Sequence, residues 1–279
     1  MKLFLKKLLY FFIAILIYFI FNFCYNFYFE NFPKNIDKNI VFIGDSHMRY
    51  SVIPDSFSSS INYGLNSDLL IAQYWKIDEL KEQNIDTIII SLGYHTFKED
   101  NIAFFKRTDG VVDELLNRYI LITEGDIFRY VNFNGKLLNC IFNKIKKPIF
   151  NYDYQGSFVG KTEIMKDKAK SAIWRHWAHN ESFNQNTIKL IENIIKKCQK
   201  LNTKIFYIFP PVSKDFKNKI PVDVTKKTDD YLNTLRNRRL LIDFKTNFND
   251  SMFFDGDHLN VNGAKKYTHL LKNNIYYVK

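Results

Sequence analysis

The chain has 279 residues, a formal net charge of +11 at pH 7 and a hydrophobic share of 46%. This length accommodates one folded domain with an appendage, and the apolar share is sufficient for a substantial core. The positive charge could attract anionic lipid headgroups or acidic glycans. The lysines are scattered along the chain rather than clustered, however, so nucleic acid is not an expected partner.

The N-terminal region predicts a membrane anchor. No charged residue occurs between Leu8 and Phe29, a run long enough to cross a bilayer as a helix. The end of this run is bulky and aromatic, without the small residues of a signal-peptide cleavage site, which favours an uncleaved anchor within residues 1–30. Three lysines precede the run, so everything after Glu30 is expected outside the cytoplasm. The expected location is the cytoplasmic membrane, crossed once, with an extracytoplasmic domain over residues 39–279.

A short polar linker, residues 31–38, leads to the first predicted strand, residues 39–43. Four consecutive apolar residues, three of them β-branched, form this strand, and Gly44 ends it. Ser46 follows the end of this strand and is expected to lie in a sharp turn. If a helix begins there, its unpaired backbone N–H groups would suit an oxygen that gains negative charge. The alternative is that Asp45 or the serine only caps a helix.

Strands and helices alternate along most of the remaining chain. One strand ends at Gly64, and another, with a continuous apolar run typical of a parallel strand covered on both faces, ends at Gly93. This alternation predicts a doubly wound α/β domain, in which ligands bind beyond the carboxyl ends of the strands. The expected strands are 39–43, 60–63, 86–93, 204–209 and 240–244, and the expected helices are 68–83, 184–201, 229–237 and a last one after Gly263.

Residues 98–183 interrupt this pattern with aromatic, asparagine-rich and lysine-rich segments. A segment of this length between two core elements is usually functional, and we interpret it as a cap that shapes the substrate cleft. Trp174, His176 and Trp177 within it could stack on sugar rings. The alternative is that they pack the small core of the insertion itself.

Cysteine and histidine spacing gives no indication of a metal centre. No Cys-x-x-Cys pair occurs, and no cofactor is expected. Cys140 and Cys198 would face an oxidising compartment and could pair. Cys198 also lies on the apolar face of a helical pattern, where it fits a small buried hydrophobic residue.

The loop after the last strand completes a candidate catalytic set. Asp255 and His258 stand three residues apart, and with an early serine they supply nucleophile, base and orienting carboxylate. Gly44-Asp45-Ser46 and Asp255-x-x-His258 resemble the first and last motif blocks of the SGNH (GDSL-type) hydrolase superfamily, serine esterases and acyltransferases on a flavodoxin-like sheet. The resemblance spans roughly residues 39–275, although only the motif blocks match clearly. Asp257, adjacent to the histidine, is a less suitable partner for it.

The resemblance also implies an oxyanion hole, built from the N–H groups of Ser46 and Gly64 and from an asparagine side chain. Where the family has Gly-x-Asn-Asp, this chain reads Gly93-Tyr94-His95-Thr96. His95 could donate through a ring N–H in place of the asparagine, or the donor could be lost. His47, next to the serine, is assigned no role.

These features predict a membrane-anchored serine esterase or O-acyltransferase that forms an acyl-serine intermediate. The expected acyl group is acetyl and the expected substrate is cell-envelope carbohydrate, which follows from the extracytoplasmic setting and from the resemblance. The expected partners are this carbohydrate or another acyl ester, the membrane through residues 8–29 and, for a transferase, a membrane acyl donor. Two alternatives stay open: a lipid or thioester hydrolase at the membrane surface, and a non-hydrolytic glycan-binding or assembly subunit on the same fold.

Overall fold

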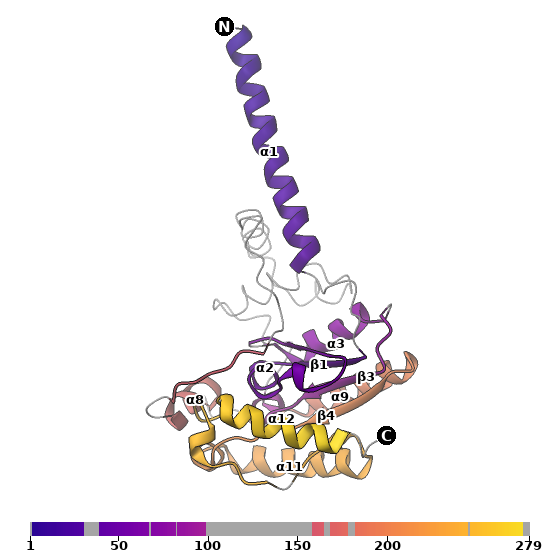
Figure 1. Cartoon of the computed structure of the whole chain (residues 1–279), viewed down its shortest axis with the longest axis vertical. Helices are drawn as coiled ribbons and strands as arrows, with labels where there is room; N and C mark the ends of the chain where they lie inside the picture. The colour runs from indigo at the N-terminus through magenta and orange to yellow at the C-terminus, as the bar shows by residue number, and fades with distance from the viewer. Residues whose placement is uncertain are drawn as a thin grey trace. The chain divides into compact units, whose positions relative to one another are not determined.

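The computed structural model describes residues 2–30, 39–66, 68–81, 83–98, 158–164, 168–177, 182–244 and 246–275. The chain divides into two units, one comprising residues 1–35 and 102–154 and the other comprising residues 36–101 and 155–279. The described part of the first unit is helix α1. The second unit contains a sheet and all the other described elements (Figure 1).

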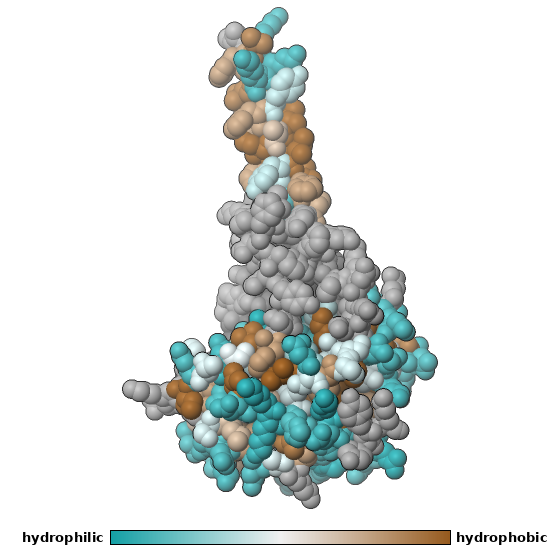
Figure 2. Space-filling view, in the orientation of Figure 1, coloured by the Kyte–Doolittle hydropathy of each residue, from teal (hydrophilic) through white to brown (hydrophobic). Residues whose placement is uncertain are grey.

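Helix α1 (Lys2–Glu30) is a continuous helix of 29 residues. Its Lys2–Asn22 stretch is long and apolar enough to cross a membrane, the one such stretch among the described residues. Figure 2 shows apolar side chains over much of its visible face. The predicted apolar N-terminal helix is therefore confirmed.

Five parallel strands form the sheet of the second unit, in the order β2-β1-β3-β4-β5. Each lies within or close to a range that the sequence predicts, because apolar and β-branched runs can be buried on both faces of a parallel sheet. The prediction of an α/β unit with a parallel sheet is confirmed. The strands are β1 (Ile40–Gly44), β2 (Ser60–Gly64), β3 (Thr87–Ser91), β4 (Lys204–Ile208) and β5 (Leu241–Ile242).

Helices pack against both faces of the sheet. On one face, Phe42 and Ile89 form a buried cluster with side chains of α2 and α12. On the opposite face, the Tyr207 hydroxyl donates a hydrogen bond of 3.3 Å to the backbone carbonyl of Ile191 in α9. The helices are α2 (Ser46–Ser51), α3 (Leu70–Glu79), α8 (Lys168–Trp177), α9 (Gln185–Lys200), α10 (Lys214–Lys217), α11 (Val222–Asn237) and α12 (Val261–Ile275), and the 3-10 turns are η1 (Pro54–Ser56), η2 (Tyr94–Phe97) and η3 (Asp250–Met252).

Two of these helices differ from the prediction. Helix α11 begins at Val222, whereas the sequence pattern indicated a start near residue 229. Pro221 directly precedes it, a position where the missing backbone N–H does not interrupt the helix. Helix α10 was not predicted, because it is a single turn held by a side-chain cap: the Ser213 hydroxyl accepts a hydrogen bond of 3.3 Å from the N–H of Phe216.

Two glycines allow the helix after β1 to pack tightly on the sheet. Gly44 and Gly64 are direct partners in the pairing of β1 with β2. A Cβ on Gly44 would lie 2.1 Å from the Ser91 hydroxyl oxygen, and a Cβ on Gly64 would lie 2.6 Å from the backbone nitrogen of Arg49 in α2. Any larger residue at either position would displace α2, and with it the serine at its first position.

The predicted insertion, residues 98–183, lies mostly outside the described residues, as does Cys140. Its described parts are residue 98, residues 158–164, α8 and residues 182–183. Cys198 is a free, buried thiol in α9, and burial raises its pKa to about 12. This position therefore holds a small buried side chain, in agreement with its place on the apolar face of the helix.

Candidate active site

The nucleophile candidate stands where β1 meets α2. Asp45 is the N-cap of α2: its carboxylate accepts a hydrogen bond of 2.8 Å from the backbone N–H of His47. Ser46 is then the first residue of the helix, at the carboxyl end of β1. The aspartate thus performs the capping that the sequence allowed, and the serine occupies the sharp turn beside it.

The structure brings the three predicted catalytic residues together from opposite ends of the domain. Ser46 Oγ lies 2.7 Å from His258 Nε2. His258 Nδ1 lies 3.0 Å and 3.1 Å from the two carboxylate oxygens of Asp255. Because a carboxylate can only accept, Nδ1 carries the proton and Nε2 is left to accept the serine hydroxyl. This is the nucleophile, base and orienting-carboxylate arrangement of a serine acyl-transfer enzyme.

The Asp255 carboxylate is fixed by its own loop. Its Oδ1 accepts hydrogen bonds from the backbone N–H groups of Asp257, at 3.1 Å, and of His258, at 2.8 Å. An antiparallel bridge between Phe253 and Leu259 closes the loop. The Asp-x-x-His spacing thus lets one carboxylate accept hydrogen bonds from the backbone of its own turn and also contact the imidazole ring. Together these hydrogen bonds restrict both side chains to one geometry.

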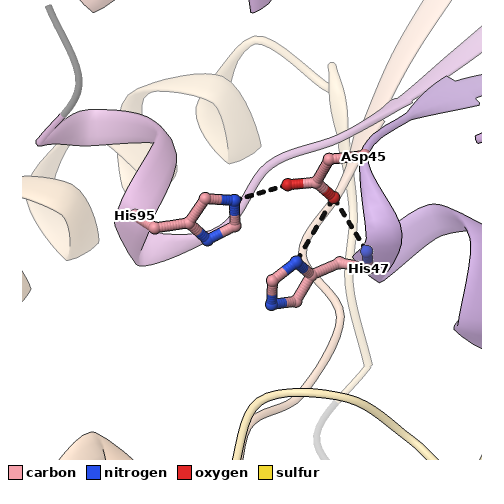
Figure 3. A group of neighbouring side chains, drawn as sticks. All are labelled: Asp45, His47 and His95. Atoms are coloured by element: carbon pink, nitrogen blue, oxygen red, sulfur yellow. Dashed lines mark hydrogen bonds and ion pairs between the residues drawn. The ribbon is translucent and has the colours of Figure 1, made fainter. Parts of the chain in front are cut away.

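A second buried cluster lies beside the triad (Figure 3). His95 Nε2 forms a short hydrogen bond with one oxygen of Asp45, and His47 Nδ1 lies 3.3 Å from the other oxygen. The two imidazole rings are stacked, with centroids 4.4 Å apart and an interplanar angle of 19°. The His47 ring also lies 4.8 Å from that of the base, His258.

The charges in this cluster follow from burial and from neighbouring groups. Burial opposes ionisation of Asp45, but His47 and His95 hold the pKa of its carboxyl well below the usual range. Burial likewise opposes protonation of His47, but Asp45, Asp257 and Asp255 raise its pKa to about 9. Burial lowers the pKa of His95, despite its carboxylate partner. At neutral pH the cluster therefore holds a carboxylate, a protonated His47 and a neutral His95.

Two of the three predicted oxyanion donors are not available. The N–H of Gly64 donates a hydrogen bond of 2.8 Å to the side-chain oxygen of Asn62. Nε2 of His95 donates to the Asp45 carboxylate, and because the ring is neutral its Nδ1 carries no proton to donate. These contacts argue against the donor roles predicted for Gly64 and His95. The N–H of Ser46, at the first position of α2, has no acceptor within the helix and remains suited to an oxyanion.

The two predicted substrate-binding tryptophans lie on α8 in different environments. Trp174 is 76% exposed, whereas Trp177 is only 6% exposed and has the Lys98 ammonium 5.6 Å from its ring centroid. Trp177 is therefore buried and does not present its ring to solvent. Trp174 stays available for a ligand.

His176, on the same helix, lies beside the candidate catalytic residues, whereas the sequence indicated either sugar stacking or packing for it. Its Nε2 is 2.8 Å from Asp257 Oδ2, and its ring centroid is 4.8 Å from that of His95. The sequence signal was weak, because a histidine between two tryptophans is as typical of a packed helix as of a functional site. Only the fold places α8 beside the loop of the base.

Histidines and aspartates this close together also raise the question of a metal ion. Ligand atoms of Asp45, His47 and His95 lie within 4.8 Å of one another, as do those of His47, Asp257 and His258. A metal binds about 2 Å from nitrogen and in the plane of the imidazole ring, and one ion cannot lie in both planes of two stacked, nearly parallel rings. In the second group, His258 Nδ1 is bound to Asp255. The geometry therefore fits a network of ion pairs better than a metal centre.

No model of a protein family and no curated protein matches this chain. The resemblance to the SGNH hydrolases consequently rests on the motif residues and on the geometry of the site.

Proposed function

We propose that this chain is a serine-dependent esterase or O-acyltransferase of the SGNH hydrolase type. The observation that carries the proposal is the 2.7 Å contact between Ser46 Oγ and His258 Nε2, with the other ring nitrogen held by Asp255. A serine hydroxyl is a poor nucleophile unless a base takes its proton, and an oriented imidazole within hydrogen-bond distance does so. Ser46 is separated from Asp255 and His258 by more than 200 residues of sequence.

The reaction proceeds in two steps. Ser46 Oγ attacks the carbonyl carbon of the acyl group while His258 Nε2 takes the hydroxyl proton, and the imidazolium then gives that proton to the departing alcohol oxygen. The acyl group is now an ester of the serine. In the second step, water or an acceptor hydroxyl loses its proton to His258 and attacks the acyl carbon, and the proton returns to the serine. Water gives hydrolysis, and a sugar hydroxyl gives transfer.

The arrangement of the sheet supports the family assignment. The strand order 2-1-3-4-5 is that of flavodoxin-like sheets, and ligands of open parallel sheets bind beyond the carboxyl ends of the strands. Ser46 follows the carboxyl end of β1, and the loop that carries Asp255 and His258 follows β5. This is the location expected for the active site of an SGNH-type enzyme.

The substrate class is proposed from the setting of the domain. Helix α1 is long enough to anchor the chain in the cytoplasmic membrane through residues 8–29, and the lysines before it favour an extracytoplasmic domain. Cell-envelope carbohydrate, with acetyl as the acyl group and a membrane acyl donor in the case of transfer, fits that setting. Trp174 is exposed and could stack on a sugar ring.

The proposed topology has a direct test. A reporter that is active only in the cytoplasm, fused after Lys279, should remain silent in cells, and a reporter that requires export should be active. Strong cytoplasmic activity would place the domain on the other side of the membrane and remove the argument for an envelope substrate.

One observation favours a second candidate, a glycan-binding or assembly subunit that does not hydrolyse its ligand. The Gly64 N–H is bonded to Asn62, and the neutral His95 ring carries its single proton on Nε2, toward Asp45, so two predicted oxyanion donors are missing. Loss of a single donor typically lowers turnover about 100- to 1000-fold. A chain with an assembled triad and a weak oxyanion hole would be a slow enzyme or a binding protein.

A fluorophosphonate probe separates these two candidates, because it reports nucleophilicity without requiring the natural substrate. The full chain, purified in detergent, should become covalently labelled. Ser46→Ala should abolish labelling and His258→Ala should nearly do so, whereas Ser251→Ala, an exposed serine on η3, should label like the wild type. Absence of labelling in folded wild-type protein would favour the binding subunit.

A further inference from the structure

We propose that Asp257 and His176 are positioning residues for the catalytic base, and that α8 of the insertion thereby forms part of the active site. The inference rests on the proposed function, because it concerns how His258 is held for proton transfer. It assigns a role to Asp257, which the sequence ranked below Asp255 as the partner of the base, and to His176, for which the sequence left sugar stacking and packing open.

The geometry shows a continuous, alternating series of imidazoles and carboxylates. Asp45 contacts both His95 and His47, with His47 Nδ1 3.3 Å from Asp45 Oδ1. His47 Nε2 lies 3.6 Å from Asp257 Oδ2, and the same oxygen lies 2.8 Å from His176 Nε2. The series thus connects the end of β3, the nucleophile turn, the loop of the base and α8.

Asp257 is the member of this series that reaches the base. Its Oδ1 lies 3.4 Å from His258 Nδ1, so this nitrogen faces a second carboxylate besides that of Asp255. When the base takes the serine proton, its ring becomes positively charged, and both carboxylates stabilise that charge. The effect depends on where the Asp257 carboxylate points, because the interaction weakens steeply with distance in a buried site.

His176 supplies the contact that orients this carboxylate. The Asp257 side chain is fully buried, and a buried carboxylate must be compensated by hydrogen-bond donors and positive charge. Burial opposes its ionisation, but His258, His176 and His47 hold its pKa well below the usual range. Of the three, His176 makes the shortest contact. Without it, the carboxylate would lose the shortest of these three histidine contacts and would be held less closely in its orientation toward the base.

A proton relay along the series would not explain the arrangement. In acyl transfer, His258 returns to the leaving group the proton that it takes from Ser46, and returns to the serine the proton that it takes from water or the acceptor. No proton is left over in either step, so no exit route is required. Positioning, in contrast, requires only that the contacts hold the groups in place.

The test measures the second-order rate constant for fluorophosphonate labelling of Ser46 in the full chain. His176→Ala should lower this constant about 10-fold, the magnitude of one lost hydrogen bond to a charged group. His176→Gln, whose amide can reach the same position as Nε2, should restore most of the rate. His176→Asn carries the same amide on a shorter side chain and should not. Lys170→Ala, at an exposed position of the same helix α8, is the matched control and should label like the wild type.

A double-mutant cycle with Asp257 distinguishes positioning from general destabilisation. If His176 acts through Asp257, His176→Ala combined with Asp257→Asn should lose no more rate than Asp257→Asn alone, because the contact is already gone. Multiplicative losses would overturn the proposal, as would equal rates for the Gln and Asn variants or a wild-type rate for His176→Ala. These outcomes leave labelling of the wild type intact, so they differ from failure of the proposed function, in which the wild type does not label at all.

Discussion

Replacing His47 by glutamine should remove a pH-dependent contribution to the stability of the sheet-containing unit. The side chain is 2% exposed and lies between the carboxylates of Asp45 and Asp257, which raise its pKa from the ordinary value of 6.5 to about 9. One pKa unit corresponds to about 1.4 kcal/mol, so the folded state gains about 3 kcal/mol from binding this proton. Glutamine keeps a hydrogen-bonding side chain of similar length but cannot carry the charge.

The sign of the pH dependence follows from the raised pKa. Below pH 6.5 the histidine is protonated in both the folded and the unfolded chain, and its contribution to stability is fully present. Between pH 6.5 and about 9 the unfolded chain has lost the proton while the folded chain retains it, so stability falls as the pH rises. Above pH 9 the contribution is gone.

Urea unfolding of the full chain in detergent, at pH 6 and at pH 9.5, measures this difference. Tryptophan fluorescence follows the sheet-containing unit, because all three tryptophans lie outside α1. The stability difference between wild type and His47→Gln should shrink by about 3 kcal/mol from the lower to the higher pH. His269→Gln, an exposed histidine on α12, should show no such change. A His47→Gln difference that is the same at both pH values would refute the ion-pair assignment.

Three further substitutions test other parts of the structure. Gly64→Ala should destabilise the fold by about 1–3 kcal/mol in urea unfolding, because its Cβ would meet backbone atoms of α2, and unchanged stability would contradict that packing. Asp68→Ala should cost about 3–5 kcal/mol, since it leaves the buried Lys76 ammonium without its 2.5 Å carboxylate partner; Asp68→Ala with Lys76→Met should recover much of the loss in the same assay. Asp255→Asn should leave the His258 ring in position but lower the probe-labelling rate about 10⁴-fold, and a near-normal rate would show that Asp255 does not orient the base.

The sequence was sufficient to locate the strands and to name the residues of the candidate catalytic set. Continuous apolar runs of β-branched residues have few alternatives to a buried parallel strand, which is why β1 and β3 were located within a residue or two. Asp255 and His258 could be named because their contact is local: the carboxylate accepts from backbone N–H groups of its own loop and holds a ring three residues away.

The histidine cluster could not be predicted in the same way. His176 meets Asp257 across 81 residues and His95 meets Asp45 across 50, so no spacing rule connects them. The oxyanion donors were assigned by their position in the motif blocks. Position alone does not show that a neighbouring acceptor already binds the donor, as the Asn62 side-chain oxygen binds the Gly64 N–H. Contacts between side chains of distant elements depend on how the strands are ordered in the sheet.

The most direct test of the central claim is to trap the acyl-serine itself. The full chain, incubated with p-nitrophenyl acetate and quenched rapidly in acid, should carry one acetyl group, and peptide mass spectrometry should place it on Ser46. Ser46→Ala should carry none, and the adduct should form far more slowly in His258→Ala. An acetyl group found only on lysines or on another serine, or at equal rates with and without His258, would contradict the account of Ser46 as a nucleophile activated by His258.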